Sequence, residues 1–278
     1  MKKTLVFAFL MALVLGASAQ ELILIGGGGL SKTDTVSTGN YGFAQARLMI
    51  PVTAGLRIGP YLGYVQYGGT ELNKTPHAAF LGKEFSYGIS FDSYGHLSYA
   101  TSYYFWLNTG AKQVSDKFED NLYKSDTKTK EFFASGGFFL TDDWLGWFGN
   151  NRIMFDYQKP SSAKISATWK GSAVASTPYN KESLRLFLES GVKRFGNENS
   201  LNVEPLIHLG YGQDFGRSQN YYEIGGGLDL GLFKEYYRDV LKVKVFYRKD
   251  FSGQIPGTLC GELVFNASSL IQAIRKNK

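Results

Sequence analysis

The chain has 278 residues, of which 33 are Gly, 21 Phe and 18 Tyr, and its formal net charge is +6. A mean hydropathy of -0.18 excludes a polytopic helical membrane protein, which needs repeated apolar runs of about 20 residues. Aromatic residues at 15% exclude a disordered chain, and the single Cys excludes an intramolecular disulfide. Because the basic residues are scattered rather than clustered, no nucleic-acid partner is expected.

Residues 1–19 have the three parts of a secretory signal peptide. Lys2 and Lys3 form a basic start, an apolar run covers residues 4–15, and residues 17–19 read Ala-Ser-Ala, the small residues that precede a cleavage site. The apolar run is too short to cross a bilayer. We therefore expect the chain to be exported and cleaved after Ala19.

Residues 22–33 read Leu-Ile-Leu-Ile-Gly-Gly-Gly-Gly-Leu-Ser-Lys-Thr, which at first suggests a strand leading into a phosphate-binding loop. That loop requires the spacing Gly-x4-Gly-Lys-[Ser/Thr], and Ser31 stands where the second glycine is needed. The sequence therefore predicts no nucleotide site, and no other cofactor motif is present. We expect a Gly-rich first strand whose missing side chains leave room or allow bending.

Strict alternation of apolar and polar residues dominates the rest of the chain. It is clearest over residues 84–92, 97–108, 184–193, 201–209, 241–248 and 258–265. A period of two predicts β-strands with one apolar and one polar face. Runs this long match the about 9–11 residues of a tilted transmembrane strand better than the about 5–6 residues of a sandwich strand. The predicted fold class is therefore all-β: a single antiparallel transmembrane barrel over residues 20–266.

The links between the predicted strands alternate in length. Short links are expected at residues 51–54, 93–95, 141–143 and 196–199, and long polar loops at residues 31–40, 69–83, 110–130 and 159–182. Thirteen segments qualify as strands, and the weakest, residues 163–170, can be part of a long loop. Since a single-chain bacterial barrel has an even number of strands, we predict about twelve, within a range of ten to fourteen, with both ends periplasmic.

One tight turn carries the only candidate catalytic residues. Asp92, His96 and Ser98 resemble the His-x-Ser arrangement of outer-membrane phospholipases, in which His activates Ser for acyl transfer. Tyr99 and Ala100 follow Ser98 in place of the Asn-Gly that the resemblance would require. The alternative is a turn histidine, and the chain is predicted not to be an enzyme. The other two histidines, at positions 77 and 208, have no zinc-type spacing, so no metal site is expected.

The predicted inner face of the C-terminal half is rich in charge, with equal numbers of cations and anions. The predicted lumen-lining residues are Arg185, Lys193, Lys242, Lys244, Arg248, Glu189, Glu204, Glu223, Asp229 and Glu262. Such a balanced set forms either a cross-barrel ion-pair network or the lining of a selective pore. Glycines at positions 191, 210, 212, 225, 227 and 231 are expected on the same inner face, and most aromatic residues toward lipid.

The signal peptide, the alternating Tyr-rich strands and the alternation of short and long links together resemble bacterial outer-membrane β-barrel proteins. Residues 236–265 are similar to the terminal barrels of polysaccharide-export and phage-adsorption outer-membrane proteins. In the commonest pattern of the family the last strand ends at a C-terminal aromatic residue, whereas here residues 267–278 follow Phe265 and Asn266. This segment is expected to be a basic tail or a short helix at the periplasmic rim.

Three functions are compatible with this sequence. The leading hypothesis is a non-enzymatic outer-membrane barrel that supports passage or secretion of a small polar solute or polymer through a narrow charged lumen. The second is a surface receptor or structural barrel with a closed lumen and interacting loops, and the third is a lipid hydrolase that uses His96 and Ser98. The expected partners are outer-membrane lipid and a polar solute, polysaccharide, phage or other surface ligand.

Overall fold

The computed structural model describes residues 21–33, 37–71, 78–142, 148–174, 182–196, 201–215, 218–232, 239–251 and 257–276. The predicted signal peptide and His77 lie outside the described residues. The elements are β1 (Glu21–Thr33), β2 (Ser37–Thr53), β3 (Leu56–Glu71), β4 (Ala78–His96), β5 (Thr101–Glu119), β6 (Tyr123–Asp142), β7 (Asn150–Trp169), β8 (Ser172–Val174), β9 (Ser183–Gly191), β10 (Leu201–Asp214), β11 (Gln219–Leu232), β12 (Asp239–Asp250), β13 (Thr258–Asn266) and α2 (Ala267–Lys276).

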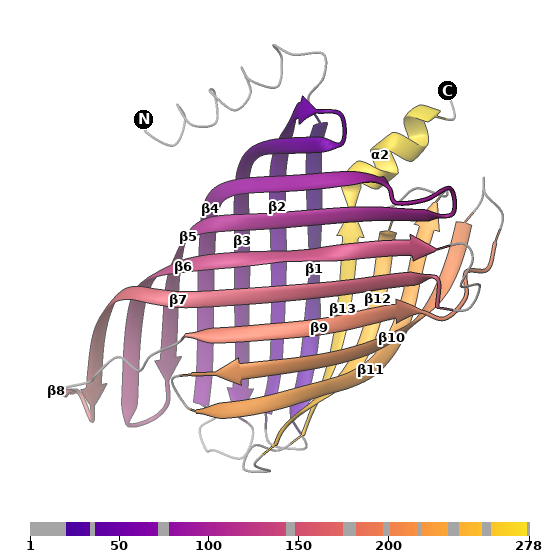
Figure 1. The fold of residues 1–278 in the computed structure, drawn as a ribbon. Helices are drawn as coiled ribbons and strands as arrows, with labels where there is room; N and C mark the ends of the chain where they lie inside the picture. The colour runs from indigo at the N-terminus through magenta and orange to yellow at the C-terminus, as the bar shows by residue number, and fades with distance from the viewer. Residues whose placement is uncertain are drawn as a thin grey trace.

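The strands form one closed antiparallel barrel (Figure 1). Each strand pairs with its neighbour along the chain, β7 pairs with β9, and β1 pairs with β13 to close the ring. The short β8 pairs only with the outer end of β7 and stays outside the ring. Twelve strands therefore make the barrel, which confirms the predicted architecture and strand number.

The link lengths differ from the prediction. Residues 110–130, expected as a long loop, belong mainly to β5 and β6, and a tight turn joins them. In that turn the Asp120 carboxylate accepts hydrogen bonds from the backbone N–H groups of Leu122 (2.8 Å) and Tyr123 (2.7 Å). The polar residues of this segment extend β5 and β6. The backbone hydrogen bonds between the two strands continue even though both faces of the sheet are polar there.

Two further link predictions are corrected. Residues 93–95 lie inside β4, and the chain turns instead at residues 97–100. Residues 163–170 fall almost entirely within β7, so they are neither a separate strand nor part of a loop. The strands β6 and β7 remain paired on both sides of a register shift at Lys130 and Glu131, so residues 163–169 continue the strand that begins at Asn150.

Alternation along the strands separates a mainly polar interior from a mainly apolar exterior. On β11 the Ile224 side chain is 53% exposed, whereas the neighbouring Glu223 is 2% exposed. The predicted inward glycines make room for interior side chains: a Cβ on Gly191 would lie 2.0 Å from Glu204 Oε1, and one on Gly210 would lie 3.0 Å from Glu223 Cβ. The apolar residues thus cover the face that a bilayer would contact.

Not all aromatic residues face outward. Tyr61 on β3 and Phe133 on β6 are buried, and their ring centroids lie 5.5 Å apart although their strands are not neighbours. Tyr104 and Phe246 are also buried on the inner face. The expectation that aromatics point toward lipid is therefore wrong for these residues, because a barrel of this size needs bulky side chains to fill its interior.

The C-terminal segment forms the helix α2, one of the two predicted alternatives. Asn266 caps it by accepting a hydrogen bond from the Ser269 backbone N–H (3.1 Å). Ser268 fixes the helix to β1, since its hydroxyl accepts from Leu24 N (2.6 Å) and donates to Leu22 O (3.0 Å). No helix in the described part of the chain is long and apolar enough to cross a membrane.

Candidate functional site

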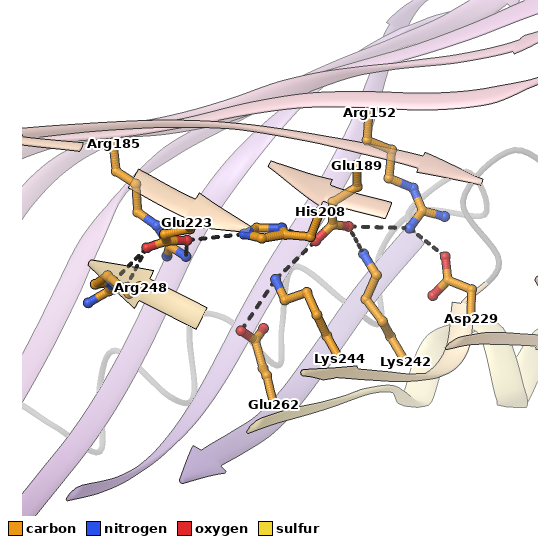
Figure 2. Close-up of polar contacts among 10 residues, drawn as sticks. All are labelled: Arg152, Arg185, Glu189, His208, Glu223, Asp229, Lys242, Lys244, Arg248 and Glu262. Atoms are coloured by element: carbon orange, nitrogen blue, oxygen red, sulfur yellow. Dashed lines mark hydrogen bonds and ion pairs between the residues drawn. The ribbon is translucent and has the colours of Figure 1, made fainter. Parts of the chain in front are cut away.

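The strongest concentration of charge lies inside the barrel between β7 and β13 (Figure 2). Glu189 on β9 is its centre. One oxygen of this carboxylate accepts from Lys244 Nζ (2.9 Å), and the other accepts from Lys242 Nζ and lies 3.9 Å from Arg152 Nη1. A single buried carboxylate thus lies among three cations from β7 and β12.

Glu223 on β11 is a second centre. It accepts hydrogen bonds from Arg185 Nη2 (2.7 Å) and from Arg248 Nε (2.7 Å). His208 lies between the two centres (Figure 2), with Nδ1 3.3 Å from Glu189 Oε1 and Nε2 3.0 Å from Glu223 Oε2. Because carboxylate oxygens only accept hydrogen bonds, the ring can donate to both only when both of its nitrogens carry hydrogens.

The remaining predicted anions extend this network toward the strand ends. Asp229 lies 2.5 Å from Arg152 Nη1, and Glu262 lies 3.5 Å from Lys244 Nζ. Glu204 is buried and accepts from Arg194 Nη2 (3.4 Å). Nine of the ten residues that the sequence analysis placed on the inner face therefore lie there in the structure.

Lys193 is the exception. The strand β9 ends at Gly191, so the alternation that placed Lys193 inside no longer applies. Its side chain is exposed, with Nζ 5.8 Å from the centre of the Phe195 ring. The neighbouring Arg194 makes the interior contact with Glu204 instead.

The N-terminal half contributes ion pairs that the sequence analysis left out. Arg57 donates to both oxygens of Asp92 (2.7 and 2.6 Å) and also contacts Glu21. Lys112 lies 3.1 Å from Glu84 and 3.3 Å from a carboxylate oxygen of Glu131. The same alternation that exposed the C-terminal charges places Glu84 and Asp92 on the polar face, so this signal was present in the sequence.

The candidate catalytic residues are not brought together. The Ser98 hydroxyl donates to Thr101 Oγ1 (2.9 Å) and accepts from the Thr101 N–H (3.0 Å), as in a turn. His96 Nδ1 instead lies 3.0 Å from Ser102 Oγ, and both oxygens of Asp92 are bound by Arg57. In this geometry the Ser98 hydroxyl bonds to Thr101 rather than to His96.

Among the described residues, no group of three or more His, Cys, Asp or Glu side chains could hold a metal ion. His208 is fully buried, but its nitrogens face two carboxylates that are themselves shared with arginine and lysine. The sequence did not predict that His208 lies between Glu189 and Glu223. Their positions relative to His208 depend on the register between strands rather than on spacing in the sequence.

The lumen also contains a cavity of about 290 Å³ at the end of the barrel where β1 begins and α2 lies. Residues of β5 and β7 line one side, and residues of β1, β12 and β13 line the other, which places the cavity inside the barrel. On the side of the cavity that faces away from α2, the side chains of Glu189, His208 and Glu223 are almost completely buried. The ion-pair network therefore fills its part of the lumen, and the cavity lies between this network and α2.

The sequence matches no protein-family model and no curated protein. The fold is similar to that of the translocator domain of the autotransporter NalP from Neisseria meningitidis, with 9% identity, 95% of this chain and 93% of that chain covered, and a TM-score of 0.55. The β domain of the Bordetella autotransporter BrkA (13% identity, 89% and 99% covered, TM-score 0.49) and the transport unit of AIDA-I from Escherichia coli (16% identity, 92% and 92% covered, TM-score 0.46) are further similar structures.

The closed ring of twelve antiparallel strands, its apolar exterior and polar interior, and the likeness to the NalP domain agree with one another. The chain has the fold of a bacterial outer-membrane β-barrel.

Proposed function

We propose that this barrel lies in the bacterial outer membrane and lets small polar solutes pass through a narrow charged lumen. The observation that carries the proposal is the charged inner face, which extends from Arg57 and Asp92 in the N-terminal half to Arg248 and Glu262 in the C-terminal half. A barrel with only a scaffolding role could fill its interior with apolar side chains, which cost nothing to desolvate.

The size of the lumen supports a small solute rather than a polymer. A barrel of about twelve strands falls between the filled eight-strand and the open sixteen-strand barrels. The network around Glu189 and Glu223 occupies the lumen between β7 and β13, so a solute passes only when long Lys and Arg side chains move aside. An extended polymer would require many of these ion pairs to break at once. The proposal includes export by the signal peptide and cleavage after Ala19.

Single-channel recording in a planar bilayer tests this function. Wild-type protein is expected to give small, stable current steps. Arg248→Ala removes a lumen cation that pairs with Glu223 and is expected to shift ion selectivity toward cations. Lys124→Ala is the matched control, since Lys124 pairs with Glu119 at an exposed rim and its loss is expected to leave selectivity unchanged. A correctly folded barrel that gives no current steps would contradict the proposal.

The second candidate is a closed barrel that acts through its surface. The nearly complete burial of Glu189, His208 and Glu223 favours it, because a permanently open pore would expose these side chains to water. The outer ends of β5, β6 and β7, which extend past the segments first expected as strands, would then provide the interaction surface. Silence in the bilayer together with a normal heat-dependent shift on a detergent gel is the outcome that supports this alternative.

A further inference from the structure

Within the described part of the chain, Arg47 on β2 makes no ion pair, whereas the other interior arginines each lie close to a carboxylate. Its side chain is only 7% exposed. Within the described part of the chain, its Nε and Nη1 atoms have no hydrogen-bond acceptor. Arg57, by contrast, is held by Asp92 and Glu21. A buried guanidinium without a counter-charge is costly, so the site around Arg47 favours a negative charge nearby.

Arg47 lines the cavity of about 290 Å³ described above. The cavity contains three other charged side chains, and each is already engaged elsewhere. Glu21 contacts Arg57, Arg152 lies 2.5 Å from Asp229, and Lys242 contacts Glu189. The positive charge of Arg47 is therefore the one that these ion pairs leave uncompensated, and the cavity favours an anion.

The walls of the cavity indicate which kind of anion fits. Phe43, Tyr104 and Trp106 provide aromatic surface, and Gln45 and Asn108 provide polar side chains beside it. A fully hydrated oxyanion such as phosphate would leave the aromatic walls without contacts, whereas an organic anion with an apolar body contacts both kinds of surface. The volume lies near the lower end of the about 300–1,000 Å³ typical of ligand pockets, so the ligand is small.

We propose that this cavity is a binding site for a small carboxylate with an apolar or aromatic body, whose negative charge compensates the charge of Arg47. The ring or alkyl part lies against Phe43, Tyr104 and Trp106. The cavity lies between the ion-pair network and α2, so its occupation does not require the network to open. Binding at this site is therefore a separate property from the proposed passage of solutes, and it is tested independently.

Calorimetric titration of the purified full-length barrel in detergent tests the site, with benzoate as the probe and neutral benzyl alcohol for comparison. Wild type is expected to bind benzoate at least tenfold more tightly than benzyl alcohol. Arg47→Gln removes the positive charge and is expected to weaken benzoate binding at least tenfold. Lys124→Gln removes a cation from the exposed rim and is expected to bind benzoate like wild type.

A second variant covers the case in which Arg47→Gln does not fold. Gln45 and Arg47 are two residues apart on one strand and share the inner face, so Gln45→Glu places a carboxylate beside Arg47 without removing it. This variant is also expected to lose benzoate binding, and its folding is checked by the heat-dependent gel shift. Failure of wild type to bind benzoate, or equal binding by wild type and the folded variants, overturns the proposal whether or not the barrel conducts ions.

Discussion

Replacing Glu189 by Gln should destabilise the barrel more than any other single charge removal in the interior. The substitution keeps the size of the side chain but removes the negative charge closest to Lys244 and one that Lys242 contacts, and both lysines are buried. It also replaces one carboxylate oxygen by an NH₂ group, which cannot accept the hydrogen bond from a lysine.

The magnitude follows from the burial of the partners. Removing one partner of a buried ion pair costs about 3–5 kcal/mol, because the remaining charge stays buried without compensation. Glu189 has close contacts with Lys242, Lys244 and His208, so the loss of free energy of unfolding is expected at the upper end of that range. Urea unfolding in detergent micelles or lipid vesicles, followed by tryptophan fluorescence, measures it.

The matched control is Glu119→Gln. Glu119 also pairs with a lysine, Lys124, at 2.5 Å, but both side chains are 63% exposed. Exposed ion pairs contribute little to stability, so this variant is expected to unfold like wild type within experimental error. Equal effects of Glu189→Gln and Glu119→Gln would refute the reasoning, since they would mean that burial of the network carries no energetic weight.

Three other outcomes are expected. Gly225→Ala should lower the midpoint of urea unfolding, because the added Cβ would lie 2.4 Å from the Phe246 backbone. Gly261→Ala should leave the midpoint unchanged, because the space around Gly261 is open. Equal midpoints for the two variants would contradict the inward placement of Gly225. Val245→Arg, on the exposed face of β12, should destabilise the barrel in lipid vesicles by about 2–4 kcal/mol, and no loss would contradict contact with lipid. Ser268→Ala should speed trypsin cleavage within α2, since it removes both hydrogen bonds to β1, and an unchanged rate would contradict that anchor.

The faces of the strands could be predicted from the sequence because a period of two has only two possible phases. Every second residue from Glu223 to Asp229, or from Lys242 to Arg248, must share a face. The exposed Ile224 on the other phase fixes which face is apolar. The positions of nine of the ten predicted interior charges follow from this single rule, whereas the strand number also required the rule that such barrels have an even number of strands.

The contacts between charges could not be predicted, because they depend on register across strands. Glu189 lies directly opposite His208, and Glu223 lies opposite Arg248. Each of these pairs would be lost if a strand slipped by one residue. The turn lengths that fix register were also misjudged, since polar residues continue β5 and β6 where a loop was expected.

The ends of strands limit prediction from the sequence in a second way. Alternation continues through Lys193 in the sequence, but the strand β9 ends at Gly191, and the lysine is exposed. The unsatisfied Arg47 shows a third limit, since nothing in its spacing distinguishes it from the paired Arg57. Both features depend on what surrounds a side chain rather than on its phase along the strand.

The most direct test of passage through this lumen uses the natural cysteine. Cys260 is buried on the inner face of β13, two residues from Glu262. Single-channel current through wild type is expected to fall after a small charged methanethiosulfonate reagent modifies Cys260, while current through Cys260→Ser continues unchanged. A folded barrel without current, or an unchanged current after mass spectrometry confirms complete modification, would contradict a conducting path through this lumen.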